Sequence, residues 1–103
     1  MSINEKMDKR YVVYILAKAQ NSTFYIGITS DLPKRVWEHK TEIADGFTKK
    51  YGIKTLVYYE IFEDPEHAIQ REKRLKRWPR SWKIKVIEEM NPDWKDLYED
   101  ICE

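Results

Sequence analysis

The residues of this sequence that could do chemistry are those that break the pattern of the element in which they lie. Glu72 is the clearest case, because Ala68, Glu72 and Leu75 follow one another at the spacings of four and three that define one helix stripe. A carboxylate in an inward-facing row is costly unless it is ion-paired, hydrogen-bonded or bound to a metal. Glu72 therefore needs a partner, either a metal ion or, in a purely structural role, Arg35 or a nearby lysine.

A second unusual pair lies in the segment that follows Ser30. Leu32 and Val36 form an apolar stripe there, and Arg35 and His39, four residues apart, place two potential cations side by side next to it. Such a pair is more often a solvated helix face than a site. Its chemistry depends on what lies opposite.

Two tyrosines lie on expected strands. Tyr14 shares a strand face with apolar neighbours, which fits a core tyrosine as well as a functional one. In the next strand Tyr25 and Gly27 share a face, and Gly27 leaves a gap beside Tyr25. Another group can approach the backbone at that gap.

The elements that position these residues follow from apolar runs and breakers. β-branched and aromatic runs indicate strands, whereas Asp31 and Asp64, each close before a proline, indicate helix starts. The segment 41–54 is predicted to be mostly loop. The expected strands cover 11–17, 23–29 and 55–62, and the expected helices cover about 31–40, 65–78 and 81–90. This order, ββαβαα, predicts an α+β fold with a three-stranded antiparallel sheet flanked by helices.

Length and composition predict a single domain over 1–103 with its core at about 11–98. With 42% hydrophobic and 36% charged residues and a mean hydropathy of -0.76, the chain is expected to be globular and soluble. We find no apolar run long enough to span a bilayer and no signal-peptide pattern at the start. The single cysteine, Cys102, excludes an intramolecular disulfide, so the prediction is a cytoplasmic protein with no membrane partner.

The net charge of +1 hides a strong segregation along the chain. Residues 71–85 carry eight Lys/Arg and one acid, whereas residues 86–103 carry one Lys and seven acids. The basic block, which also contains Trp78 and Trp82, is typical of surfaces that bind polyanions or single strands. A solvated helix face and two core tryptophans are the alternative explanation.

Together these residues form a pattern that resembles the GIY-YIG endonuclease family, and in particular its small single-domain bacterial members. The match extends from about residue 11 to residue 98. The first triplet reads VVY and the second YIG. The residues that carry the resemblance are Val12-Val13-Tyr14, Tyr25-Ile26-Gly27, Thr29, Asp31-Leu32, Arg35, His39 and Glu72.

The resemblance implies a metal-dependent endonuclease that hydrolyses DNA, in a structure-specific role in repair or recombination. Glu72 would hold one Mg²⁺ or Mn²⁺, and Arg35 would place a positive charge on the phosphate. Tyr14 or Tyr25 would take a proton from the attacking water, and His39 would bind the phosphate, orient a tyrosine or move a proton. Because a phenol has an ordinary pKa of about 10, such a base needs nearby cations.

Residues outside the chemistry are expected to contact the DNA backbone. The candidates for substrate binding are Gly27, Lys49, Lys50, Arg74 and Arg77. Asn91 is similar to a family asparagine near the metal, although it lies far from Glu72 in the sequence.

Two other functions compete with the enzyme. The first is a non-catalytic nucleic-acid-binding module on the same fold, whose signature would be a lost Glu or Arg. The second is a protein-interaction domain whose basic helix meets an acidic partner, such as the acidic tail of another copy. We expect a monomer or weak dimer, with a protein partner as one route to targeting.

Overall fold

The protein is described here by a computed structural model that covers residues 10–19, 23–41 and 50–102. Its sheet has three strands, β1 (Tyr11–Ala17), β2 (Phe24–Thr29) and β3 (Thr55–Phe62). β1 is the central strand, and both neighbours run antiparallel to it. The structure thus confirms the predicted α+β fold with a three-stranded antiparallel sheet.

The helices begin and end at the breakers in the sequence. The side chain of Asp31 accepts a hydrogen bond from the Lys34 amide at the start of α2, and Asp64 caps α4 in the same way. Trp78 is extended, as a residue before proline prefers to be, and this separates α4 from α5. The helices of the described ranges are α2 (Leu32–Lys40), α4 (Pro65–Arg77), α5 (Arg80–Met90) and α6 (Tyr98–Ile101).

Two further predictions concern the segment 41–54 and the absence of a membrane span. The segment 41–54, predicted to be mostly loop, is described at residue 41 and from residue 50 onward, where residues 50 and 51 are helical. Within the described ranges, none of the helices has the length and apolar character needed to cross a membrane.

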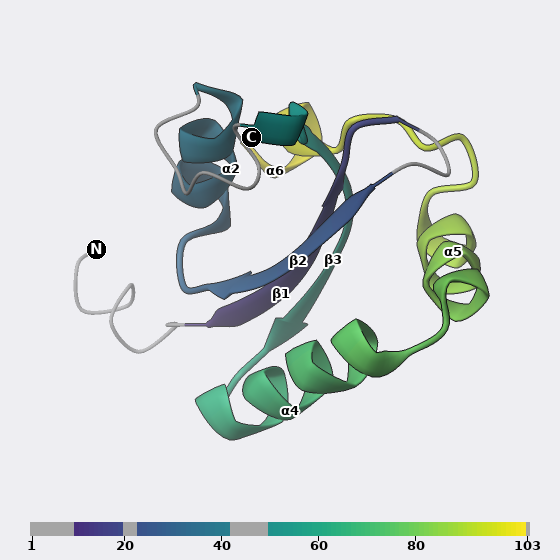
Figure 1. Cartoon of the computed structure of the whole chain (residues 1–103). Coiled ribbons are helices and arrows are strands. Elements are labelled where there is room, and N and C mark those ends of the chain that lie inside the picture. The colour runs from purple at the N-terminus through teal and green to yellow at the C-terminus, as the bar shows by residue number, and fades with distance from the viewer. Residues whose placement is uncertain (1–9, 20–22, 42–49, 103) are drawn as a thin grey trace.

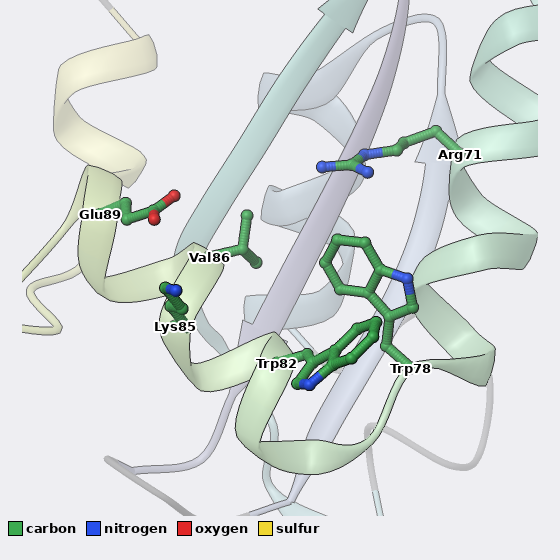
Figure 2. Close-up of a pocket in the computed structure, with 6 residues that line it drawn as sticks. All are labelled: Arg71, Trp78, Trp82, Lys85, Val86 and Glu89. Atoms are coloured by element: carbon green, nitrogen blue, oxygen red, sulfur yellow. The ribbon is translucent and has the colours of Figure 1, made fainter.

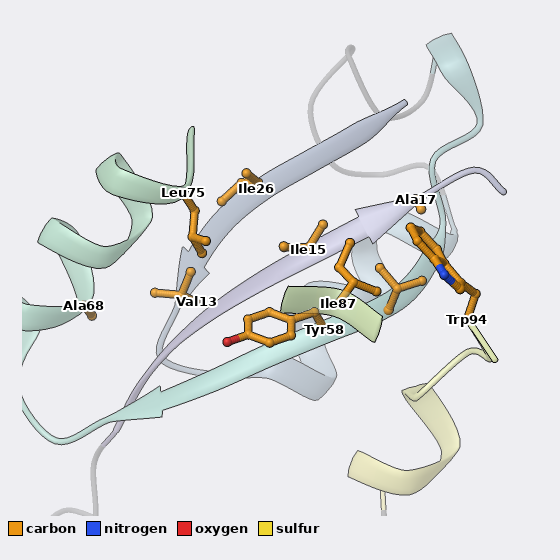
Figure 3. Packing of buried hydrophobic residues seen from close by; sticks show 10 residues of the cluster. Val13, Ile15, Ala17, Ile26, Tyr58, Ala68, Leu75, Ile87 and Trp94 are labelled. Carbon is orange, nitrogen blue, oxygen red and sulfur yellow. The ribbon is translucent and has the colours of Figure 1, made fainter. Parts of the chain in front are cut away.

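The helices cover both faces of the sheet. Figure 1 shows α2 and α6 on one side of the strands and α4 on the other. Alternate residues of β1 divide between two apolar clusters, so that Val13 and Ile15 face α4 and Tyr14 faces α2. On the α4 side, Leu75 packs against the strands, as Figure 3 shows.

A bulge in β3 ties the C-terminal segment to the sheet. Ile15 pairs with Tyr58 and Leu16 pairs with Leu56, so Val57 has no partner in β1. The side-chain amide of Asn91 donates a hydrogen bond to the Val57 carbonyl over 3.2 Å. The segment after α5 is thereby fixed to the edge of the sheet.

Candidate active site

The hydroxyl of Tyr14 lies at the centre of a buried polar cluster on the α2 side of the sheet. Its Oη is 3.2 Å from Nε2 of His39, and Nε of Arg35 donates a hydrogen bond to it over 3.4 Å. Tyr14 and His39 are each only 1% exposed. The cluster therefore places a fixed positive charge and a proton-carrying ring against one phenol oxygen.

Helix α2 supplies both partners because of its apolar spacing. Leu32 and Val36 are buried in the cluster that contains Tyr14, which turns this side of the helix toward the sheet. Arg35 and His39 lie one turn apart next to that stripe. The structure thus brings both side chains to the Tyr14 hydroxyl, and His39 is buried rather than on a solvated face.

Gly27 makes room for the phenol. It is the β2 partner of Tyr14, and a Cβ atom at this position would lie 2.5 Å from the Tyr14 Oη and 2.6 Å from its Cζ. Such distances are too short for any side chain to be accommodated without a shift. The close approach predicted at Gly27 is therefore made by Tyr14, and contact of Gly27 with substrate stays a prediction.

Tyr25 completes the cluster from the edge strand. Its half-buried ring lies 6.2 Å from the ring of Tyr14 and 5.2 Å from that of His39, measured between centroids. Partial burial alone would lower the pKa of Arg35, but hydrogen bonds with Tyr14, Glu38 and Tyr25 raise it above its ordinary value. Arg35 therefore stays positively charged between two phenols.

Glu72 does not join this cluster directly. It lies on α4, which packs on the opposite face of the sheet, between the buried Ala68 and Leu75. The prediction of an inward position is confirmed, since the Glu72 side chain is 16% exposed. Its partner is Lys76, whose Nζ lies 3.0 Å from Oε2, rather than Arg35.

Three of the remaining predicted residues, Lys50, Arg74 and Arg77, lie on the surface. Lys49 lies outside the described residues, and Lys50 is exposed, with its Nζ 5.5 Å from the centre of the Tyr51 ring. Arg74 and Arg77 are exposed on α4. The structure thus groups Tyr14, Tyr25, Gly27, Arg35 and His39.

Asn91 has a structural explanation. It is 3% exposed, and its amide nitrogen donates to the Val57 and Lys95 carbonyls at 3.2 and 2.8 Å. Its side-chain oxygen accepts a hydrogen bond from the Lys95 amide at 3.1 Å. Through these hydrogen bonds, the Asn91 side chain fixes the backbone at Val57 and Lys95.

Two charged partners were not anticipated from the sequence. Glu38 binds Nη1 of Arg35 over 3.1 Å, and its position three residues after Arg35 on the same helix was a usable signal. Glu60 on β3 accepts a hydrogen bond from Nε of Arg71 on α4 over 2.8 Å. No local pattern indicates this second pair, because the fold alone brings the two elements together.

Comparisons with known proteins place the chain in a family. The family model for the GIY-YIG catalytic domain matches residues 10–85. A UPF0213 protein of Staphylococcus saprophyticus is 35% identical over 83 residues, which cover 81% of this chain and 99% of that protein. A UPF0213 protein of Bacillus pumilus is 31% identical over 93 residues, 90% of this chain and 95% of that protein.

A solved structure supports the same fold. The solution NMR structure of a UPF0213 protein from Bacillus halodurans matches with a TM-score of 0.54 and 24% identity, covering 84% of this chain and 92% of that one. The family model and the relatives together carry the assignment. The chain belongs to the GIY-YIG family of nuclease domains, and the relatives described above are small UPF0213 proteins of bacteria.

Proposed function

We propose that this protein is a metal-dependent endonuclease that hydrolyses phosphodiester bonds of DNA. The observation that carries the proposal is the convergence of Arg35, His39 and two tyrosines on one buried cluster. A guanidinium and an imidazole at one phenol oxygen are groups that can stabilise phosphate charge and transfer protons.

Tyr25 is the proposed general base. The attacking water must touch the base, and the half-buried Tyr25 is accessible to solvent, whereas Tyr14 is 1% exposed. Tyr14 has a positioning role in this scheme, because its hydroxyl holds Arg35 and His39 in place. The hydrogen bond between Tyr25 and Arg35 places the guanidinium beside this phenol.

Arg35 is proposed to contact the phosphate. Its Nε and Nη1 groups bind Tyr14 and Glu38, and the planar guanidinium has five N–H donors in total. A guanidinium can bind phosphate oxygens through several N–H groups as negative charge increases in the transition state. The ion pair with Glu38 orients the guanidinium beforehand.

The position of Glu72 on α4 supports its inclusion in the site. Consecutive helix residues are rotated by about 100°, so Arg71 and Glu72 lie on opposite flanks of the row formed by Ala68 and Leu75. Arg71 binds Glu60 of β3, which turns its flank toward that edge of the sheet. The Glu72 flank then turns toward the other edge strand, β2, whose Tyr25 packs on the opposite face of the sheet.

The donor chemistry at Glu72 fits a divalent cation. Mg²⁺ is commonly held by one or two carboxylates together with water and substrate phosphate, so a single glutamate suffices. The ammonium group of Lys76 already lies at Oε2, where a cation is favourable. When bound, the ion would act as a Lewis acid on the phosphate. Within the described ranges, no cluster of three or more His, Cys, Asp or Glu side chains is present at Glu72 or elsewhere.

Cleavage of a labelled DNA panel tests the proposal. Single-stranded, duplex, flap and branched substrates are incubated with and without Mg²⁺ or Mn²⁺, using the native protein, Arg35→Ala and the matched control Lys34→Ala, an exposed neighbour on α2. We expect metal-dependent cutting that falls by about 10²–10³-fold in Arg35→Ala and persists in Lys34→Ala. Equal cutting by all three proteins would contradict the proposal.

A non-catalytic binding module is the second candidate. It is favoured by one observation, the ion pair that Lys76 makes with Glu72 on the face opposite Tyr14. In that case all three proteins bind DNA and none cuts it. The Arg35→Ala protein would then bind DNA more weakly than the other two.

A further inference from the structure

A cavity of about 320 Å³ opens between α4 and α5, away from the candidate active site. Figure 2 shows its lining: the indoles of two tryptophans and the side chains of both helices surround the space. The lining residues are Arg71, Trp78, Trp82, Lys85, Val86 and Glu89. The cavity therefore combines exposed aromatic surface with cationic groups.

The two indoles have different surroundings. The Cζ atom of Arg71 lies 4.9 Å from the centre of the Trp78 ring, so the guanidinium covers part of that indole. Trp82 meets Trp78 edge to face, with centroids 5.6 Å apart and planes inclined by 75°, and Trp82 is 55% exposed. Trp82 therefore presents apolar ring surface to solvent at the border of a cavity.

Polar groups face each other across this space. The Arg71 guanidinium and the Glu89 carboxylate point toward one another from α4 and α5, as Figure 2 shows. Arg71 is held by its hydrogen bond to Glu60, which uses part of its five N–H donors. A guanidinium donates hydrogen bonds and a carboxylate accepts them, so together they can bind a ligand ring that has both acceptors and donors on its edge.

The segment that runs from α4 into α5 beside the cavity is rich in cations. Residues 71–85 carry eight Lys/Arg and one acid. The cavity lining itself contributes two of these cations, Arg71 and Lys85, beside one carboxylate, Glu89. A ligand that brings negative charge can pair with the two cations.

We propose that this cavity binds an unpaired nucleotide of single-stranded nucleic acid, with its base against Trp82 and its phosphate on the basic groups around Lys85. Bases of a duplex are already stacked, whereas an unpaired base exposes a flat face and a polar edge. The inference rests on the proposed function in taking nucleic acid as the substrate. It adds the substrate class: DNA with a single-stranded part, such as a flap or a branch.

The location separates binding from cutting. Arg71 directly precedes Glu72, but the two side chains lie on opposite flanks of α4, so the cavity holds a strand beside the reaction and not at it. Trp82 is therefore a binding residue. Its loss weakens affinity for single strands without removing any group of the Tyr14 cluster.

Fluorescence anisotropy in EDTA tests the proposal without cleavage. The probe is a labelled single-stranded DNA of about 12 nucleotides, compared with the same sequence as duplex and as RNA. The variants are Trp82→Ala and the matched control Trp37→Ala, a 48% exposed tryptophan on α2. We expect Kd for the single strand to rise by about 5- to 100-fold in Trp82→Ala, with duplex binding and the control almost unchanged. The RNA arm identifies which sugar is preferred.

A second readout guards against misfolding. Binding of the single strand is expected to quench tryptophan emission in the native protein and in Trp37→Phe, and much less in Trp82→Phe. Equal quenching in both variants would contradict the proposal. So would equal loss of single-strand and duplex binding in Trp82→Ala.

Other outcomes separate this inference from its alternatives. If Trp82→Ala instead dissociates a dimer in sedimentation, with unchanged affinity for the single strand, the surface pairs copies of the chain and the proposal is wrong. A protein that binds single strands through Trp82 but cuts nothing refutes the nuclease and keeps this site. If the protein cuts DNA but Trp82→Ala leaves its affinity for the single strand unchanged, the nuclease is supported and this binding site is refuted.

Discussion

The hydroxyl of Tyr14 and Nε2 of His39 lie 3.2 Å apart, although 25 positions separate them in the sequence. One residue comes from the central strand and the other from the last turn of α2, and both are 1% exposed. A polar contact enclosed among apolar side chains holds both rings in one arrangement. Changes that displace the phenol should therefore affect both stability and activity.

Gly27→Ala should displace the phenol directly. The new Cβ would lie 2.5 Å from the Tyr14 Oη, so the ring or the strand must move. We expect the free energy of unfolding to fall by about 1–3 kcal/mol, as in other overpacked cores, and the cleavage rate to fall with it. Urea unfolding followed by a cleavage assay checks both. A variant with native stability and native rate would show that Tyr14 tolerates the displacement.

Removing each tyrosine hydroxyl tests their proposed division of roles. Tyr25→Phe should abolish most cleavage while leaving the urea midpoint nearly unchanged, because Tyr25 is half-buried at the edge strand. Tyr14→Phe should lower stability by about 1 kcal/mol or more, because it removes the buried hydroxyl that contacts both His39 and Arg35, and should retain more activity. The reverse pattern, with greater loss of activity in Tyr14→Phe at native stability, would make Tyr14 the base.

The strands and helices could be predicted from the sequence because their signals are local. The apolar runs identify the strands, and Asp31 and Asp64 cap α2 and α4 where expected. The spacing of three and four also placed Glu72 correctly between two buried residues. Periodicity carries this kind of information without knowledge of the fold.

The contacts that define the site could not be predicted in the same way. That Tyr14 lies over Gly27 depends on the register between β1 and β2, and the bond from Asn91 to Val57 depends on a bulge in β3. Both are properties of pairing between distant segments. The sequence indicated an open gap at Gly27, whereas the fold fills it with Tyr14.

Asn91→Ala should destabilise the protein without changing its metal requirement. The buried amide bonds the carbonyls of Val57 and Lys95, which would lose their donor. We expect the free energy of unfolding to fall by about 1–3 kcal/mol. Thermal unfolding and an Mg²⁺ titration of cleavage measure the two effects. Native stability with a raised metal requirement would instead place Asn91 at the ion.

Lys76→Ala should strengthen divalent metal binding. The ammonium of Lys76 lies at Oε2 of Glu72 and competes with a metal ion for the carboxylate. Because a partly exposed ion pair contributes little, we expect Kd for Mn²⁺ to fall by only about two- to fivefold. Calorimetric titration with Mn²⁺ checks this, with Lys73→Ala, an exposed lysine on α4, as the control. Weaker Mn²⁺ binding in Lys76→Ala would contradict competition at this carboxylate.

Metal-dependent cleavage by Glu72→Gln, compared with Glu66→Gln, tests the nuclease proposal most directly. Both glutamates lie on α4, but Glu66 is exposed in its first turn whereas Glu72 is 16% exposed. Across a titration of Mg²⁺ and Mn²⁺, we predict native cutting by Glu66→Gln and a loss of about 10²-fold or more in Glu72→Gln that added metal does not restore. Native metal-dependent cutting by Glu72→Gln would exclude Glu72 as the metal ligand and contradict the proposed site.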